Sequence, residues 1–268
     1  MQFINTELPD IIELRNISQV YDNTNVVLKD FNLLIEDQPN RGQFVCLLGA
    51  SGCGKSTILR YMTGLQEPTS GEIFFKGRPI TKKDRVGMVF QQYSSFPWLS
   101  VLENVALGLE FQGISKKERN DRAMEMLQIV GLEKHKDKYA KYPTLSGGQL
   151  QRVAIARSLL SNPEIIVMDE PFGALDINTR LRMQDMLMDI WMKVKPTIVL
   201  VTHDISEAVY LGDDIYIMRA NPGVITEHVK VNFPIPRVKE LKRTPDFMNM
   251  VHMIEDKMVQ VEQTSVKK

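Results

Sequence analysis

The stretch Phe44-Val-Cys-Leu-Leu-Gly-Ala-Ser-Gly-Cys-Gly-Lys-Ser-Thr57 decides the fold of this chain. Its first five residues are apolar without interruption, which is typical of a short strand buried on both faces of a parallel sheet. A glycine-rich loop follows, and Lys55–Gly64 then has helical character. The order strand, loop, helix predicts an α/β fold with the loop at the carboxyl edge of the sheet.

The loop within this stretch, Gly49–Ser56, matches the pattern G-x-x-x-x-G-K-[ST]. Its glycines let backbone N–H groups turn toward phosphate oxygens, and the N-terminus of the following helix adds positive potential. In such a loop the lysine reaches the β- and γ-phosphates and the serine hydroxyl ligates Mg²⁺. The alternative, a glycine-rich turn without a ligand, is disfavoured by the flanking strand and helix. The predicted nucleotide-phosphate site comprises Gly49, Ser51, Gly52, Cys53, Gly54, Lys55, Ser56 and Thr57.

A second apolar run, Ile165–Met168, ends in two carboxylates, Asp169 and Glu170. A strand that ends there places both side chains at the edge of the sheet where ligands bind in α/β folds. We expect Asp169 to hold Mg²⁺, through water, and Glu170 to polarise an attacking water molecule. A strand that simply turns into solvent would look the same, so the pair gains its meaning from following the phosphate loop.

The rest of the chain supports an alternation of strands and helices, which indicates a parallel α/β sheet. Residues 92–150 lack strong strand signals and are expected to be a mostly helical insertion, and Asp37–Gly42 is a polar loop. Thr244-Pro245 predicts the start of a C-terminal helix, which would pack on its own domain or on a partner subunit. Further predicted strands are Ile11–Val20, Phe31–Ile35 and Ile198–Val201, and further predicted helices are Ser115–Ile129, Gln149–Leu160 and Thr179–Val194.

Composition narrows the possible classes of protein. Apolar residues make up 43% of the 268 residues, and 33 basic residues balance 33 acidic ones. This balance argues against a dedicated nucleic-acid binder. The N-terminus lacks a signal-peptide pattern and no apolar run could span a membrane, so we expect a soluble chain that reaches a membrane only through a partner.

The two cysteines, Cys46 and Cys53, are expected to be free thiols. Cys53 lies within the phosphate loop, and two interpretations are open. It is either a small filler residue or a thiol close enough to nucleotide that alkylation would block binding.

The segment Leu145-Ser-Gly-Gly-Gln149 precedes a helix and also has two interpretations. Its serine and glycines could present donors to a second anion at a helix N-terminus. They could equally be an ordinary capped helix start. The residues of the segment alone do not decide between these.

Gly49–Ser56, Leu145–Gln149 and Ile165–Glu170, in that order, resemble the ATP-binding-cassette (ABC) family. Three further segments are similar to its glutamine loop, D-loop and histidine switch: Val89-Phe90-Gln91, Gly173–Asp176 and Thr202-His203-Asp204. The resemblance implies a P-loop NTPase (RecA-like) core with a helical subdomain and a small antiparallel β region. We expect four parts: residues 1–90 with the β region and the first part of the core, 91–150 as the helical subdomain, 151–230 as the second part of the core, and 231–268 as a C-terminal helical extension.

The resemblance also implies an ATPase that works as a homodimer in its ATP state, with ATP and Mg²⁺ held between two copies. Glu170 would be the general base, Gln91 would sense Mg²⁺ and water, and His203 would contact the γ-phosphate. The other implied roles are adenine stacking for Tyr21, ATP binding in trans for Ser146, Gly147, Gly148 and Gln149, dimer coupling for Asp176, and metal binding for Ser56, Gln91 and Asp169.

Three of these assignments have open alternatives from the residues alone. Spacing does not separate Gln91 from its neighbour Gln92, although alignment on Val89-Phe90 favours Gln91. His203 could be a capping or packing residue, and Tyr21 could be a half-buried strand aromatic.

Three segments narrow the resemblance to the nitrate/sulfonate/taurine importer ATPases: Phe96-Pro97-Trp98, Asn221-Pro222-Gly223 and Phe233–Arg237. Those proteins work with two integral membrane permease subunits and an extracytoplasmic solute-binding protein, at the cytoplasmic face of the membrane. The loop Tyr93–Leu99 would help to receive the permease, unless it is a locally packed loop. Alternatives are an exporter or division-type complex, and an ATPase acting on nucleic acid. The neutral charge and the missing coiled coil count against the last alternative.

Overall fold

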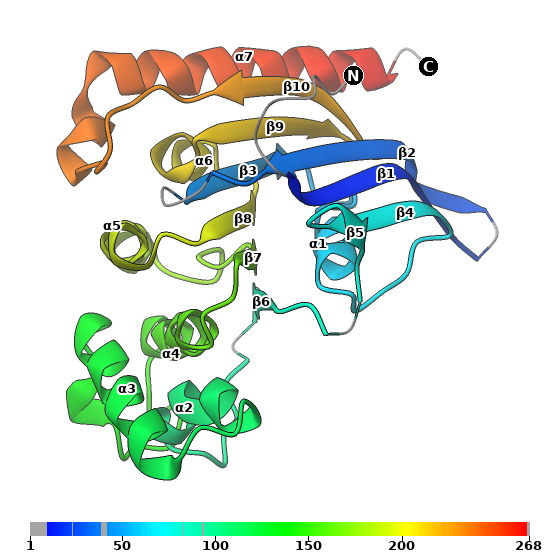
Figure 1. The fold of residues 1–268 in the computed structure, drawn as a ribbon. Helices are drawn as coiled ribbons and strands as arrows, with labels where there is room; N and C mark the ends of the chain where they lie inside the picture. The colour runs from blue at the N-terminus through cyan, green and yellow to red at the C-terminus, as the bar shows by residue number, and fades with distance from the viewer. Residues whose placement is uncertain (1–9, 23, 39–41, 82, 93, 267–268) are drawn as a thin grey trace.

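The fold consists of two β-sheets, with helices on both sides of the larger one (Figure 1). A computed structural model describes residues 10–22, 24–38, 42–81, 83–92 and 94–266. Four sequence predictions fall partly on residues outside these ranges: those for the N-terminal residues 1–9, for residues 39–41 of the polar loop, for Tyr93 of the aromatic loop and for residues 267–268 of the C-terminal extension. Within the described ranges, no helix is long and apolar enough to cross a membrane.

The larger sheet has six strands in the order β10-β9-β3-β8-β7-β6. All neighbouring pairs are parallel except β9 and β10, which are antiparallel. The expected parallel sheet is therefore confirmed, and the strand before the phosphate loop lies inside it. The strands are β3 (Gln43–Gly49), β6 (Val86–Val89), β7 (Ile165–Asp169), β8 (Thr197–Thr202), β9 (Asp214–Arg219) and β10 (Val224–Lys230).

The smaller sheet is antiparallel, in the order β2-β1-β4-β5. It contains both predicted N-terminal strands and two that were not predicted. Its β1–β2 hairpin pairs Tyr21 with Asn25 at the end of the ladder. The strands are β1 (Asp10–Tyr21), β2 (Asn25–Glu36), β4 (Ser70–Phe75) and β5 (Arg78–Pro79).

Helices cover both faces of the larger sheet. Figure 1 shows α4, α5 and α6 on one side and α1, with the smaller sheet, on the other. Helices α2 and α3 pack with α4 below the sheet. The expected helical character of residues 92–150 is confirmed. The helices are α1 (Lys55–Met62), α2 (Val101–Phe111), α3 (Lys116–Ile129), α4 (Gly147–Leu160), α5 (Ile177–Val194), α6 (Ile205–Leu211) and α7 (Pro245–Val266), with short 3-10 turns at Glu133–His135 and Lys239–Arg243.

The residues of strand β3 show that the larger sheet is buried on both faces. Phe44, Cys46 and Leu48 belong to the core formed with α4, α5 and α6, whereas Val45 and Leu47 belong to the core on the α1 side. Because successive side chains of a strand point to opposite faces, a strand between two helical layers must be apolar at every position. This is the physical reason that the unbroken apolar run predicted the strand correctly.

The C-terminal helix α7 begins where the sequence indicates. The Thr244 hydroxyl accepts a hydrogen bond from the Phe247 N–H at 3.3 Å, so the threonine caps the helix. Phe247, Val251 and Ile254 are buried against α6 and β9, and Figure 1 shows α7 running along the β10 edge of the sheet. Of the two alternatives for this helix, packing on its own domain is confirmed.

Candidate functional site

A cavity of about 550 Å³ lies at the carboxyl edge of the larger sheet, around the phosphate loop. Its size falls in the range of small-molecule sites. It brings together residues predicted from three motifs that are distant in sequence. The lining residues are Tyr21, Asn25, Val26, Val27, Ser51, Gly52, Gly54, Lys55, Ser56, Thr57, Gln91, Glu170 and Asn221.

The phosphate loop depends on glycine at two positions. Gly52 and Gly54 have φ of 82° and 93°, in the left-handed region that side chains other than glycine rarely adopt. A Cβ at Gly54 would also lie 2.7 Å from the Leu28 side chain. Gly54 is the N-cap of α1, so the loop delivers the backbone N–H groups at the helix N-terminus to the cavity.

Lys55 is only 5% exposed, and its ammonium group bends back over the loop. Its Nζ donates hydrogen bonds to the carbonyl oxygens of Gly49, at 2.7 Å, and Ala50, at 2.9 Å. The charge is thus already fixed at the mouth of the loop. A phosphate oxygen would be a stronger, charged acceptor than either carbonyl.

Ser56 and Asp169 join the first and second motifs. The Ser56 hydroxyl donates to Asp169 Oδ1 at 3.0 Å. Burial raises the pKa of the Asp169 carboxyl, and the hydrogen bond from Ser56 opposes that rise. A hydroxyl and a carboxylate in contact form the all-oxygen donor set that Mg²⁺ prefers, so these residues fit the expected metal.

Glu170 lies at the centre of a second cluster. Its Oε2 accepts a hydrogen bond from Gln91 Nε2 at 3.2 Å, and His203 Nδ1 lies 3.2 Å from the same oxygen. Gln91 lines the cavity and Gln92 does not, which favours the first of the two glutamines. The backbone of Glu170 has φ of 43°, a conformation uncommon outside glycine and often found at functional sites.

Two residues predicted for the phosphate site do not line the cavity. The Cys53 side chain is fully buried in the core on the α1 side, and Gly49 approaches the Met218 backbone so closely that a Cβ would lie 2.7 Å from its oxygen. Burial raises the pKa of the Cys53 thiol. Both cysteines are free, as expected. Cys53 therefore packs as a small core residue, which favours the filler interpretation over direct contact of the thiol with nucleotide.

The segment at the start of α4 lies outside the cavity. Ser146 and Gln149 form a capping box: the serine hydroxyl accepts from Gln149 N–H at 3.3 Å, and Gln149 Oε1 accepts from the Ser146 N–H at 2.8 Å. A Cβ at Gly148 would lie 2.7 Å from the Thr179 methyl group, and Asp176 caps α5 by accepting from the Thr179 N–H. The capped-start interpretation is thus correct for the isolated chain, and the starts of α4 and α5 are in contact.

Four lining residues were not predicted: Asn25, Val26, Val27 and Asn221. The first three follow Tyr21 across the hairpin turn, so a predicted hairpin at Tyr21 would have indicated that they lie near the cavity. Asn221 belongs to the turn between β9 and β10, and nothing in its local sequence points to the phosphate loop.

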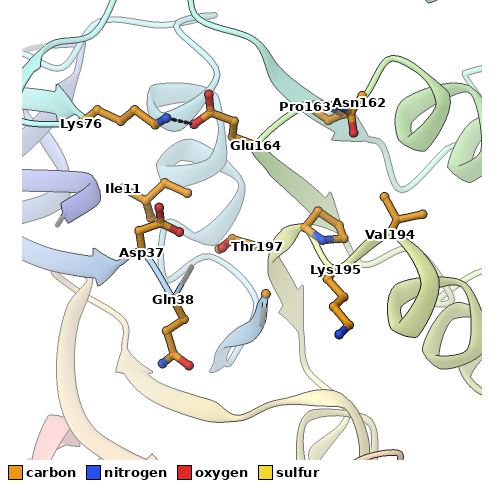
Figure 2. A pocket seen from close by; sticks show the side chains of 12 residues that line it. Ile11, Asp37, Gln38, Lys76, Asn162, Pro163, Glu164, Val194, Lys195 and Thr197 are labelled. Atoms are coloured by element: carbon orange, nitrogen blue, oxygen red, sulfur yellow. Dashed lines mark ion pairs between the residues drawn. The ribbon is translucent and has the colours of Figure 1, made fainter. Parts of the chain in front are cut away.

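A second cavity, of about 310 Å³, lies at the opposite edge of the sheet, where β7 and β8 begin. Figure 2 shows Lys76 pointing toward Glu164, with which it forms an ion pair of 2.5 Å, and Lys195 below them. No residue of the predicted motifs lines it. The chemistry-bearing residues are therefore concentrated at the carboxyl edge.

Comparison with known proteins agrees with this site. Residues 31–173 match the domain family described as ABC transporter. The chain is 48% identical over 230 residues to the nitrate import ATP-binding protein NrtD of Synechocystis sp., a match that covers 83% of this chain and 84% of that protein. It is 44% identical over 225 residues to the aliphatic sulfonates import ATP-binding protein SsuB of Bacillus subtilis, covering 83% of each.

Solved structures give the same answer. A dimeric post-hydrolysis state of the ATP-binding cassette MJ0796 bound to ADP and Pi superposes with a TM-score of 0.69 at 35% identity, over 83% of this chain and all of that one. The expected ABC ATPase fold is confirmed. The phosphate loop, the Asp169–Glu170 pair and these similarities lead to one conclusion: the chain belongs to the ABC transporter family and is an ATPase of that family.

Proposed function

We propose that this chain is the ATP-hydrolysing subunit of an importer for a small oxyanion or sulfonate. The observation that carries this proposal is the similarity, over more than four-fifths of the chain, to subunits named for nitrate import and for aliphatic sulfonate import. Nitrate and sulfonates each carry a compact oxyanion group, which is planar in nitrate and tetrahedral in a sulfonate. The two identities, 48% and 44%, are too close to favour either solute.

ATP binding begins at the phosphate loop. The N–H groups of the loop and of the α1 N-terminus take the β- and γ-phosphates, and Lys55 exchanges its bonds to the Gly49 and Ala50 carbonyls for phosphate oxygens. Tyr21 also lines the cavity, and its aromatic ring is the group proposed to stack on the base. The Tyr21 hydroxyl already accepts a hydrogen bond from Gln66 Nε2 at 2.8 Å, which orients the ring.

Mg²⁺ would be held by Ser56, Asp169 and Gln91, of which the first two are in direct contact. When bound, the ion supplies positive charge that offsets the negative charge of the phosphate oxygens.

Hydrolysis depends on the cluster around Glu170. This carboxylate accepts a proton from the attacking water, as a general base. Gln91 and His203 both contact Glu170 Oε2, so they orient the carboxylate. His203 is exposed on its other side, where it can reach a γ-phosphate bound at the loop. Phosphoryl transfer needs this positioning and charge stabilisation more than covalent chemistry.

The complete site requires a second copy. The α4 start, with Ser146, Gly147, Gly148 and Gln149, lies outside the cavity, so it serves the nucleotide of a partner. Its capping box pre-forms a helix N-terminus with unpaired N–H groups, which suits a γ-phosphate. Asp176 begins α5 beside Gly148 and links the two sites across the homodimer. Of the four expected parts of the chain, residues 1–90 and 151–230 contribute strands to the same larger sheet, so they act together in each copy.

The remaining partners are two integral membrane permease subunits and an extracytoplasmic solute-binding protein. The permease subunits hold the chain at the cytoplasmic face of the membrane. The surface that supports this is the loop of residues 94–99, where the Trp98 side chain is 67% exposed. Asn104, fully buried, fixes the loop by bonding both the N–H and the carbonyl of Phe96. Arg157 donates to the Ser94 carbonyl and hydroxyl. A rigid loop that exposes an aromatic side chain is suited to protein docking.

The test is reconstitution of the chain in liposomes with the two proposed permease subunits and the proposed solute-binding protein. Nitrate, taurine and an alkanesulfonate are offered in turn, and both ATP turnover and uptake are measured. One of these solutes should stimulate both activities, and Glu170→Gln should abolish both. Export of the solute, or turnover that none of the three stimulates, would reject the importer assignment while leaving the ATPase assignment intact.

A further inference from the structure

The segment between β10 and α7, residues 231–244, is anchored at the end of α6 that lies away from His203. Arg237, which is 4% exposed, donates to the Tyr210 carbonyl at 3.3 Å and to Asp213 Oδ1 at 2.7 Å. The Tyr210 hydroxyl donates back to the Arg237 carbonyl at 3.3 Å. These contacts fix the place at which the segment enters its 3-10 turn, Lys239–Arg243.

Lys242 reaches from this turn to side chains of both α5 and α6. Its Nζ donates to Gln184 Oε1 at 2.8 Å, lies 3.6 Å from Asp185 Oδ1 and lies 3.6 Å from the centre of the Tyr210 ring. The Lys242 side chain is 18% exposed. Burial lowers the pKa of its ammonium group, and Asp185 opposes that fall. A largely buried charge of this kind is held where its partners compensate it, so Lys242 has a defined position.

Gln184 connects Lys242 to Glu207 of α6. It is 3% exposed, and its Nε2 donates to Glu207 Oε2 at 3.4 Å while its Oε1 accepts from Lys242. Because the amide oxygen only accepts and the amide nitrogen only donates, Gln184 can make both bonds in only one of its two orientations. Lys242 therefore favours the orientation in which Gln184 offers a donor to Glu207.

Glu207 supports the turn Thr202-His203-Asp204. Its N–H donates to Asp204 Oδ1 at 3.0 Å, so Asp204 caps α6, and the Asp204 N–H donates to Thr202 Oγ1 at 3.0 Å. The Glu207 side chain lies against the same turn: burial raises the pKa of its carboxyl, and the neighbouring Thr202 side chain opposes that rise. His203 is the middle residue of the turn, so a displacement of Glu207 would displace the imidazole.

We propose that Lys242 is a positioning residue for ATP hydrolysis, which sets the place of the His203 imidazole through Gln184 and Glu207. Lys242 does not line the nucleotide cavity, so it acts only through these residues. The inference rests on the proposed contact of His203 with the γ-phosphate. It gives the segment between β10 and α7 a part in hydrolysis as well as in holding α7 on the domain.

The first measurement is steady-state ATP turnover by the full chain. Lys242→Met keeps most of the side-chain stem but removes the ammonium group, which frees the Gln184 amide to turn. It should lower kcat by about 3- to 30-fold and leave KM for ATP within about twofold, because a group that acts in the transition state is displaced while the phosphate loop is unchanged. Gln184→Met interrupts the same connection without altering the segment, and should have the same effect.

The second measurement is the NMR spectrum of the imidazole groups, which a loss of stability alone would not move selectively. The chain has four histidines, so isotope-labelled histidine gives few signals, and His203→Gln identifies that of His203. Lys242→Met should shift the His203 signal and leave the signal of His228 in place, because His228 pairs with Asp214 in a different part of the fold.

Lys239→Met is the matched control, because Lys239 lies in the same 3-10 turn but its side chain is 75% exposed. It should keep the wild-type kcat and spectrum. An unchanged kcat or an unshifted His203 signal in Lys242→Met would overturn the proposal, as would an equal loss of turnover in Lys239→Met. Should Lys242→Met fail to fold, Gln184→Met decides by the same two measurements.

His203→Gln separates this inference from the role on which it rests. Wild-type turnover in His203→Gln would reject the proposed role of His203 and this inference with it. Reduced turnover in His203→Gln together with wild-type turnover in Lys242→Met would reject this inference alone.

Discussion

His203 Nδ1 and Glu170 Oε2 lie 3.2 Å apart, and the same carboxylate oxygen accepts a hydrogen bond from Gln91. One oxygen of Glu170 is thus held by two neutral or cationic donors from different loops. If Glu170 is the general base, as proposed, its other oxygen would take the proton from water. Because the two oxygens of this carboxylate have different surroundings, replacing Glu170 is the most informative test of the proposed hydrolysis.

Glu170→Gln should lower ATP turnover by roughly 10²- to 10⁴-fold, because an amide cannot accept the proton. The dissociation constant for ATP should stay within about threefold of wild type, since the loop is unchanged. A dimer should accumulate in ATP on size-exclusion chromatography. A variant that turns over near the wild-type rate would show that another group is the base.

Lys55→Met should weaken ADP binding by about 10- to 150-fold, which corresponds to the loss of one or two charge-assisted hydrogen bonds. Methionine keeps most of the buried stem, so thermal unfolding should change little. Titration calorimetry gives the affinity, and Lys193→Met, in the last turn of α5 and away from the cavity, is the control. Equal losses in the two variants would indicate a non-specific effect of charge.

We expect the buried carboxyl group of Glu207 to make the free energy of unfolding fall as pH rises. Its side chain is 3% exposed, and burial raises the pKa of its carboxyl to about 8. Because the folded pKa lies above the unfolded one, near 4.5, the folded chain binds a proton that the unfolded chain releases. The stability that Glu207 contributes is therefore fully present below about pH 4.5 and is lost progressively up to about pH 8.

Glu207→Gln removes this dependence while keeping the shape of the side chain. Urea unfolding at pH 6 and pH 8.5 should show the wild type losing on the order of 1–3 kcal/mol relative to this variant. Glu255→Gln, exposed on α7, should track the wild type. Parallel pH profiles for the wild type and Glu207→Gln would mean that Glu207 is already ionised in the folded chain.

Cys53 should resist alkylation in the folded protein. The thiol is fully buried, and its raised pKa lowers the fraction of reactive thiolate. N-ethylmaleimide should label the native chain at least about tenfold more slowly than the chain in urea. The Cys53→Ala variant separates the labelling of Cys53 from that of Cys46. Fast native labelling at Cys53, blocked by ATP, would restore the view that the thiol contacts nucleotide.

The strands that could be predicted are those buried on both faces. Phe44–Leu48, Ile165–Met168 and Ile198–Val201 are continuously apolar, because helices cover them on both sides. Strands β9 and β10 were missed because polar residues interrupt them, and β6 because it has only four residues, one of them Gly87.

The site was predictable to the extent that it lies in local motifs. Gly49–Ser56 and Asp169–Glu170 each carry their chemistry within a few consecutive residues. Asn221 could not be found in this way, because its place depends on Gly223 packing on the Cys53 carbonyl. Cys53 was ambiguous for a related reason: a loop motif fixes the backbone, but the direction of a small side chain depends on the surrounding core.

The placement of β3 between β8 and β9 also has a consequence for biosynthesis. The strand that carries the phosphate loop is made before both of its hydrogen-bonding neighbours, and Asn221 of the cavity lining is made after them. When the chain has been made as far as residue 196, every motif residue of the loop is present, but neither β8 nor β9 has been made. The lining of the nucleotide cavity is therefore complete only after Asn221 has left the ribosome.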